Sequence, residues 1–329
     1  MSLPPNDRTT ERARPLPPSE AAKILAARKP EWLKIRAPGG EKYAEIKGLL
    51  RGQKLHTVCE EAHCPNLSEC WASGTATFML GGDICTRACR FCAVKTARIP
   101  PALDPNEPLH VAQSIVALKL KYVVLTSVDR DDMADGGAGH FAETVKEIKA
   151  RDAAVLVEAL VSDFRGDRRA IETVVESHLD VYAHNVETVE RLQYRVRDPR
   201  AGYAQSFEGL RYAKEFAVKK GIPLLTKSSV MLGLGEEDAE LRATFADLRK
   251  VGVDILTLGQ YLRPSMTHLP VERFYTPEEF EALRVVAESF GFTYVASGPL
   301  VRSSYKAAEF FLTKEIKKIK ETTNAIHTP

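Results

Sequence analysis

The chain has 329 residues, 44% of them hydrophobic and 27% charged, which is typical of a globular protein with one or two domains. Lys and Arg number 46 and Asp and Glu number 44, so the net charge of +2 gives no indication of a nucleic-acid or anionic membrane partner. No run of about 18 apolar residues occurs, and we therefore expect no transmembrane helix.

Residues 1–55 are predicted to form an N-terminal extension that is flexible or wraps around the rest of the chain. Its first thirty residues are rich in Pro and Arg and lack the apolar stretch of a secretory signal. Asp7, Glu11 and Glu20 argue against a transit peptide, because such presequences contain few acidic residues. We therefore expect a cytoplasmic protein.

Residues 56–74 carry the first of two cysteine triplets, spaced C-x4-C-x5-C, and the second is spaced C-x3-C-x2-C. Thiols in a chain without an export signal are more often metal ligands than disulfide partners. The triplets are the only cysteines of the chain: Cys59, Cys64 and Cys70, then Cys85, Cys89 and Cys92.

The grouping in threes indicates which kind of metal site to expect. A structural zinc site uses four ligands, often two C-x2-C or C-x4-C pairs, and that alternative leaves Cys70 and Cys85 without a role. A 4Fe-4S cluster has four iron corners, and a triplet fills three of them. The open corner is then a position where chemistry can occur.

Residues 75–298 are predicted to form a barrel-like α/β domain. Segments rich in Val, Ile, Leu, Tyr and Thr alternate with amphipathic helical patterns, which predicts parallel strands covered by helices. About six such β/α repeats favour a partial (β/α)6 TIM-like barrel, with a doubly wound sheet as the alternative. The expected strands are "TFMLGGDI", "KYVVLTSV", "AAVLVEALV", "DVYAHNVE", "PLLTKSSVML", "DILTLGQYL" and "FTYVASG".

Two helical patterns in this domain are clear. Phe141, Val145 and Ile148 recur at helical spacing. In the second, Thr276 is the predicted N-cap, followed by Pro277, with Glu279 closing a capping box.

Polar residues gather where the expected strands end. In a barrel the functional site lies at the carboxyl-terminal ends of the strands, so we expect these side chains to meet at one end, although each could be an ordinary capping group. "GLGE" at 233–236 also follows a strand, but it lacks the third glycine of a dinucleotide-binding loop. The strand-end set is Asp129, Arg130, Asp131, Glu158, Asn185, Glu187, Lys227, Gln260 and Arg263.

Residues 299–329 form the predicted C-terminal extension. It begins with "GPLVRSSY" around Ser303 and continues with lysines at 314, 317, 318 and 320. This second part is typical of a solvated amphipathic helix, with an acidic partner surface as the weaker alternative.

The C-x3-C-x2-C spacing, with Phe91 directly before the last cysteine, resembles the radical S-adenosylmethionine (SAM) superfamily. Both triplets in this order, together with further motifs, resemble the lipoyl synthase family over residues 50–310. Those motifs are "LTSVDRDDMADGGAGHF", "HNVETVERL", "VRDPRAGY", "TKSSVMLGLGE", "LGQYLRPS" and "RSSY".

The resemblance implies two 4Fe-4S clusters and SAM as cofactors. Cys85, Cys89 and Cys92 would hold the cluster that cleaves SAM to a 5′-deoxyadenosyl radical. Cys59, Cys64 and Cys70 would hold an auxiliary cluster that donates sulfur, with Ser303 as its fourth ligand in preference to His56 or His63. The expected SAM contacts are Thr126, Ser127, Asn185, Glu187 and Lys227, with strand-end capping as their ordinary alternative.

The implied activity is insertion of two sulfur atoms, at C6 and C8, into an octanoyl chain on a lysine of a carrier domain. The implied partners are lipoyl carrier domains of 2-oxoacid dehydrogenases, the glycine cleavage H protein, and an electron donor such as ferredoxin or flavodoxin. Alternatives are sulfur insertion into a free small molecule, as in biotin synthase, an iron–sulfur electron carrier, and a zinc-stabilised interaction protein.

Overall fold

The computed structural model describes residues 30–33, 47–48, 51–52, 55–57, 60, 66 and 77–303. The predictions for Cys59, Cys64 and Cys70, for His63 and for the basic C-terminal helix lie outside the described residues.

One sheet of eight strands organises the described part of the chain, in the order β1-β2-β5-β6-β7-β8-β9-β10. All neighbours from β2 to β10 are parallel, and β1 pairs antiparallel with β2. Among the described residues the two end strands do not pair with each other, so the barrel is open. The strands are β1 (His56–Thr57), β2 (Thr77–Leu80), β5 (Tyr122–Ser127), β6 (Leu156–Leu160), β7 (Val181–Ala183), β8 (Leu225–Leu232), β9 (Ile255–Gln260) and β10 (Tyr294–Gly298).

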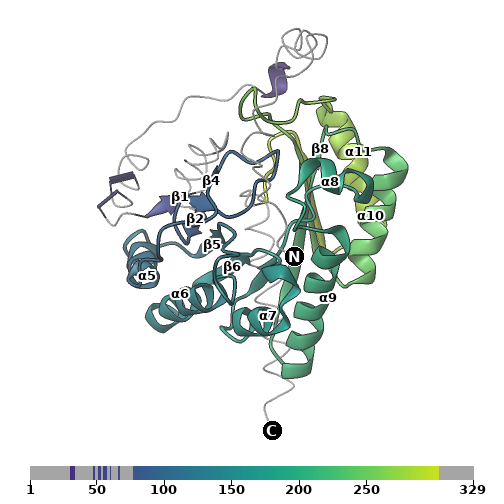
Figure 1. Cartoon of the computed structure of the whole chain (residues 1–329). Helices are drawn as coiled ribbons and strands as arrows, with labels where there is room; N and C mark the ends of the chain where they lie inside the picture. The colour runs from purple at the N-terminus through teal and green to yellow at the C-terminus, as the bar shows by residue number, and fades with distance from the viewer. Residues whose placement is uncertain are drawn as a thin grey trace, which may run out of the picture.

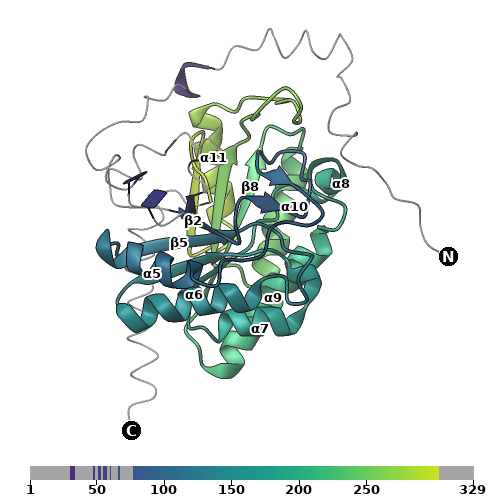
Figure 2. The ribbon, with the colours of Figure 1, turned by 60° about the vertical axis from the view of Figure 1, so that its left-hand side comes forward.

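Helices form a single layer on the outside of the strands (Figures 1 and 2). Successive helices also contact each other around this layer. A doubly wound sheet would carry helices on both faces, so the prediction of a partial barrel is confirmed. The helices are α5 (Glu107–Ala117), α6 (Ala138–Arg151), α7 (Arg168–Val175), α8 (Gln193–Val196), α9 (Tyr203–Lys220), α10 (Asp238–Lys250) and α11 (Pro277–Glu288), with short 3-10 turns η1 (Glu31–Leu33), η2 (Phe164–Gly166) and η3 (Glu190–Leu192).

The predicted punctuation of α11 is confirmed. Thr276 is the N-cap, its hydroxyl accepts from the backbone of Glu279, and the Glu279 carboxylate accepts from the backbone of Thr276. Pro277 occupies the first position of the helix, where its missing N–H has no consequence.

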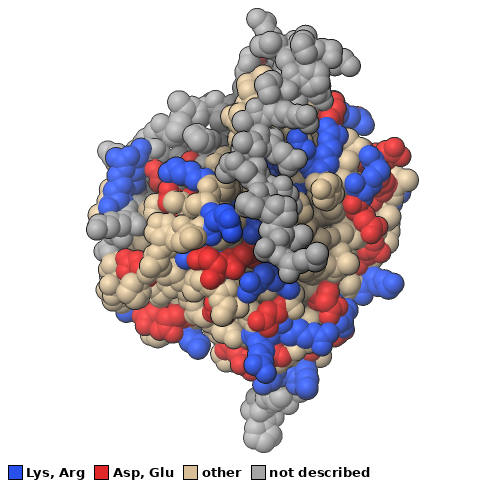
Figure 3. All heavy atoms as spheres, viewed as in Figure 1, with Lys and Arg blue, Asp and Glu red and all other residues tan. Residues whose placement is uncertain are grey.

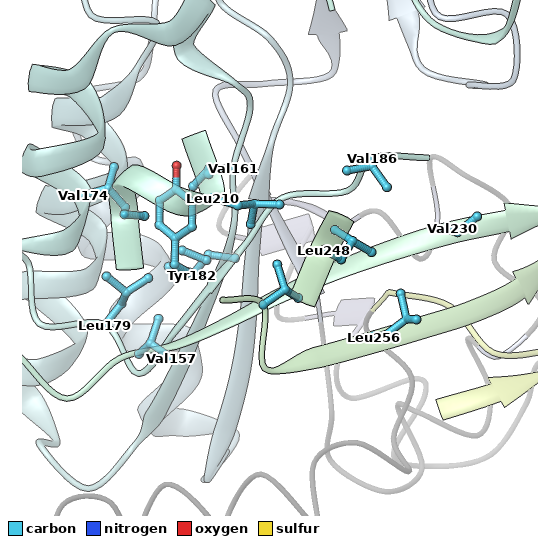
Figure 4. Close-up of a cluster of buried hydrophobic side chains, with 14 of the residues drawn as sticks. Val157, Val161, Val174, Leu179, Tyr182, Val186, Leu210, Val230, Leu248 and Leu256 are labelled. Carbon is cyan, nitrogen blue, oxygen red and sulfur yellow. The ribbon is translucent and has the colours of Figure 1, made fainter. Parts of the chain in front are cut away.

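The main apolar core lies between the strands and the helices (Figure 4). Tyr182 of β7 is fully buried there with Val174 and Leu179, and burying each such side chain stabilises the fold by about 1.5–3 kcal/mol. Side chains from the other face of the strands fill the inside of the barrel. Near the strand starts these are Tyr122, Val124, Leu156, Val181, Leu225 and Ile255.

The surface carries both signs of charge side by side (Figure 3). This agrees with the net charge of +2. None of the helices in the described part of the chain is both long and apolar enough to cross a membrane.

Candidate functional site

A cavity of about 530 Å³ opens at the carboxyl-terminal ends of the strands, within the range of small-molecule sites. Residues from β2, β5, β6, β8 and β9 line it, together with the segment that follows β7 and the loop between β3 (Ile84–Cys85) and β4 (Lys95–Thr96). Leu33 of η1, which precedes the barrel in sequence, and Ser303, which follows it, also line the cavity.

Cys85, Cys89 and Cys92 all line this cavity. The backbone N–H groups of Arg87 and Asp129 point at the sulfur of Cys85, each at 3.3 Å, and that of Asp198 points at the sulfur of Cys89 at 3.3 Å. Burial raises the pKa of Cys89 to about 12 and that of Cys85 higher still. The thiols therefore need a bound cation to ionise at neutral pH, and N–H groups are already aimed at two of the sulfurs.

Arg87 ties the cysteine loop to the ends of β5 and β6. Its guanidinium is 3% exposed and donates to both oxygens of Asp131 at 2.8 and 2.9 Å and to both oxygens of Asp163 at 2.7 and 2.8 Å. Asp129 lies 3.4 Å from the same group. Burial alone would favour the neutral acid, but the bonds from Arg87 hold the pKa of Asp163 far below its usual value. The loop is thus fixed by buried charge.

The segment that follows α8 anchors the loop from its other side. Asp198 accepts the backbone N–H of Ala88 at 2.9 Å, and Arg200 donates to the carbonyl of Thr86 at 2.7 Å. Although burial opposes ionisation, hydrogen bonds from Arg200 and Ala88 lower the pKa of Asp198 to about 2. The cysteine loop is therefore attached to the ends of β5 and β6 and to the segment after α8.

Four of the five expected SAM contacts line the cavity: Thr126, Ser127, Asn185 and Glu187. Glu187 has a left-handed backbone with φ 67°, which two bonds to β8 maintain, from its N–H to Ser229 O at 3.0 Å and from Met231 N–H to its carbonyl at 2.9 Å. Burial raises the pKa of Glu187, while a hydrogen bond from Asn185 opposes that shift. Such strain in a half-buried acid that lines a cavity is typical of a functional position.

Lys227 is not at the cavity, and its predicted position at the strand-end site is wrong. It is 1% exposed, in the first half of β8, and donates to both oxygens of Glu158 at 2.8 and 2.9 Å. Tyr122 donates to the same carboxylate at 2.5 Å. Glu158, placed in the same predicted set, is also wrong in position. Both are held among the apolar side chains near the strand starts.

Other strand-end predictions resolve into structural roles. Gln260 lines the cavity but its amide is used on backbone groups, including Leu232 O at 3.0 Å and Tyr275 N–H at 2.9 Å. Arg130 pairs with Asp132 outside the cavity. In the "GLGE" turn the Glu236 carboxylate accepts hydrogen bonds from the backbone N–H groups of residues 233 and 234. None of the four residues of this turn lines the cavity. Arg263 does line it.

Ser303 lies at the cavity at the end of a segment that follows β10. The carbonyl of Leu300 in this segment accepts a hydrogen bond of 2.6 Å from the side chain of Asn66. Asn66 stands between Cys64 and Cys70 in the sequence. Asn66 and the Ser303 segment therefore meet, although they are 234 residues apart at this contact.

Sequence reasoning missed a buried polar chain on the wall of the cavity. Arg197 donates to Ser206 at 2.8 Å, Ser206 lies 2.9 Å from His184 Nε2, and His184 Nδ1 lies 2.9 Å from the carbonyl of Val161. Arg197 and His184 both line the cavity. The quoted motifs "HNVETVERL", which begins with His184, and "VRDPRAGY", which contains Arg197, pointed to this region without indicating the polar chain.

The donors present fit an iron–sulfur cluster. Among the described residues no three His, Cys, Asp or Glu side chains converge as ligands of one metal ion would. Three thiols around a cavity mouth, with N–H groups directed at their sulfurs, are instead the donor set of a larger cluster with one open corner. The free volume beside them leaves room for a small organic ligand.

Comparisons with known families and proteins agree with this reading. A model described as the radical SAM superfamily matches residues 79–248, and one described as the N-terminal domain of lipoyl synthase matches residues 15–64. The lipoyl synthase of Myxococcus xanthus is 59% identical over 285 residues, which cover 87% of this chain and 94% of that one. The mitochondrial lipoyl synthase of Danio rerio is 58% identical over 303 residues, which cover 90% and 75%.

Among solved structures, the chain is similar to methylornithine synthase. The TM-score is 0.51 at 12% sequence identity, over 95% of each chain. A likeness at this identity concerns the fold alone, and it agrees with the partial barrel.

Proposed function

Because the chain belongs to the lipoyl synthase family of the radical SAM superfamily, we propose that it inserts two sulfur atoms at C6 and C8 of an octanoyl chain attached to a carrier lysine. The observation that carries the proposal is that Cys85, Cys89, Cys92 and Ser303 line one cavity. The second cysteine triplet and the serine of the "RSSY" motif thereby face the same cavity.

In this proposal Cys85, Cys89 and Cys92 hold the cluster that binds SAM. Arg87 and Asp198 position them by fixing the loop in which they lie. Thr126 and Ser127, at the end of β5, and Asn185 and Glu187, beyond β7, face the same cavity and would bind SAM. The half-buried Glu187 carboxylate offers an acceptor for hydroxyl groups. Lys227 takes no part.

Cys59, Cys64 and Cys70 hold the auxiliary cluster, with Ser303 Oγ as fourth ligand. The contact between Asn66 and Leu300 supports this assignment, because Asn66 lies between Cys64 and Cys70 in sequence and Leu300 lies three residues before Ser303. A serine oxygen is a harder ligand than thiolate, so this bond is the one most readily released.

When bound, the two clusters and SAM supply a 5′-deoxyadenosyl radical for each C–H bond and the sulfur that replaces the hydrogen. The chain's own residues surround that chemistry with apolar walls, including Leu33, Met79, Met231 and Val301. These side chains exclude water and give an acyl chain an apolar surface.

The substrate in this proposal is a lysine amide on a folded domain, such as the lipoyl domain of a 2-oxoacid dehydrogenase or a glycine cleavage H protein. A carrier surface immobilises a flexible eight-carbon chain at lower entropic cost than free binding would. Ferredoxin or flavodoxin would supply electrons, and the thiol usage supports a reducing, cytoplasmic location.

The test is anaerobic incubation of the full chain with an octanoylated carrier domain, SAM and a reductant, followed by mass spectrometry of the carrier. We expect the carrier to gain two sulfur atoms and 5′-deoxyadenosine to accumulate. SAM cleavage without any sulfur on the carrier contradicts the proposal. Equal turnover of free octanoic acid contradicts the carrier-bound substrate and favours the biotin-synthase-like alternative.

Metal analysis of anaerobically purified protein separates the remaining alternatives. Two 4Fe-4S clusters correspond to about eight irons and about eight sulfides per chain. Stoichiometric zinc without sulfide supports the zinc-stabilised protein instead. Iron and sulfide without SAM cleavage support an electron carrier.

A further inference from the structure

The segment that follows β10 turns back across the mouth of the barrel. Val301 donates its N–H to Gly298 at 3.1 Å and is 8% exposed. Its carbonyl lies so close to Gly259 of β9 that a Cβ on that glycine would stand 2.1 Å away. The absence of a side chain at Gly259 therefore lets the backbone of Val301 pack directly against β9. This contact fixes one side of the segment two residues before Ser303.

The other side of the segment is held by Asn66. Its amide donates to Leu300 O at 2.6 Å, and the residue is only 4% exposed. This is a partly buried hydrogen bond from the side chain of Asn66 to the backbone of the Ser303 segment. Losing the donor removes the modest net contribution that one hydrogen bond makes to the ordering of this segment.

The first cysteine segment is also fixed at its start, on the opposite edge of the open barrel. His56 and Thr57 of β1 pair with Met79 and Phe78 of β2. Thr57 is fully buried, and its hydroxyl lies 3.4 Å from both the backbone N–H and the carboxylate of Glu60. Thr57 and Glu60 are therefore attached to β2 at one edge of the barrel, and Asn66, six residues after Glu60, reaches the segment beyond β10.

We infer that Asn66 is a positioning residue for Ser303, the proposed ligand of the auxiliary cluster: its hydrogen bond to Leu300 clasps the two edges of the open barrel and fixes the segment that carries Ser303 at the cavity. The inference rests on the proposed function, in which Ser303 binds that cluster. The proposed ligands lie far apart in sequence, in the first cysteine segment and at Ser303. The hydrogen bond from the Asn66 amide to Leu300 O joins these two regions. Asn66 itself does not bind iron.

The first experiment measures hydrogen exchange at the backbone of residues 300–303 in the full chain, purified anaerobically. Asn66→Ala removes the donor, and Asn66→Asp keeps the shape but places an acceptor against the carbonyl. We expect exchange in this segment to become roughly 5- to 30-fold faster in both variants. Asn106→Ala is the matched control, because Asn106 is exposed and its side chain makes no cap bond.

The second measurement is the Mössbauer spectrum of ⁵⁷Fe-loaded protein. A general loss of fold would remove iron from both clusters. Loss of positioning alone leaves 5′-deoxyadenosine formation near the parent level and removes the signal of the oxygen-ligated iron. Gly259→Ala displaces Val301 on the β9 side of the segment and should likewise remove the signal of the oxygen-ligated iron. This variant keeps the test valid if the Asn66 variants do not fold.

Unchanged exchange at 300–303 in both Asn66 variants overturns the clasp. Faster exchange with an unchanged iron spectrum overturns the positioning role. Failure of the proposed function is a different result: the parent chain would then make no lipoyl product, while the exchange experiment would still decide whether Asn66 holds the segment.

Discussion

The two ends of the barrel interior both contain buried charge, but they use it differently. At the carboxyl-terminal ends of the strands, Arg87 is shared among Asp129, Asp131 and Asp163 beside an open cavity. Near the strand starts, Lys227 is closed in by apolar side chains and bonds to a single carboxylate.

The difference lies in what each group leaves open. The charges near the strand starts satisfy each other and do not line the cavity, so breaking this pair costs stability without touching the site. The charges at the cavity hold a loop whose three thiols still face free volume. We therefore expect substitutions at the cavity to change activity, and substitutions near the strand starts to change stability alone.

Ser303→Ala is expected to have the largest effect on product formation while changing the stability of the fold little. This variant should still form 5′-deoxyadenosine but make little or no lipoyl product, because the auxiliary cluster lacks its releasable ligand. Ser304→Ala, one residue further on, should keep most activity. Mass spectrometry of the carrier and quantification of 5′-deoxyadenosine measure both products. Near-normal lipoyl formation by Ser303→Ala removes this residue from the mechanism.

Arg87→Met should cost both stability and activity. Removing the guanidinium leaves buried carboxylates without a partner, and breaking a buried pair in this way lowers the free energy of unfolding by about 3–5 kcal/mol. Anaerobic urea denaturation measures the change, and iron analysis reports whether the cysteine loop still holds its cluster. Arg284→Met, which breaks only exposed pairs on α11, should give no resolvable change. Equal effects of the two variants contradict the bracing role of Arg87.

Lys227→Met is expected to lower the free energy of unfolding by about 3 kcal/mol, the lower end of the range for a broken buried pair, because Tyr122 still donates to Glu158. SAM affinity of the folded fraction should remain unchanged. The double variant Lys227→Met with Glu158→Gln should recover much of the loss, since no buried charge remains unpaired. A large fall in SAM affinity would return Lys227 to the cofactor site.

The smallest expected effect concerns the pH dependence of stability. Burial, followed by the nearby Arg197, lowers the pKa of His184 to about 4, so the folded state keeps this imidazole neutral. The unfolded state takes up a proton below pH 6.5, and stability therefore falls as the pH drops from about 6.5 toward about 4.

His184→Asn removes this titration. Urea denaturation of the parent chain should lose about 2 kcal/mol more than the variant between pH 7 and pH 5. The same comparison made above pH 7 should show no difference in slope. Identical pH profiles below pH 7 contradict a buried neutral His184.

Local patterns predicted the strands, the capping box of α11 and the approach of Asn185 and Glu187 to the cavity. They failed for Lys227 because alternation along a strand says which face a side chain points to, but not how far along the barrel it lies. Local patterns also could not predict the role of Arg87, because the three carboxylates around its guanidinium come from two other loops. The same limit applies to Asn66, whose partner is 234 residues away.

The division of labour between the two cysteine triplets is tested most directly by one pair of variants. Cys89→Ala and Cys59→Ala are each incubated anaerobically with octanoylated carrier, SAM and reductant, and 5′-deoxyadenosine and carrier mass are measured in the same sample. We predict that Cys89→Ala forms neither product, while Cys59→Ala forms 5′-deoxyadenosine and no lipoyl group. Identical behaviour of the two variants would contradict the assignment of SAM cleavage to one triplet and sulfur donation to the other.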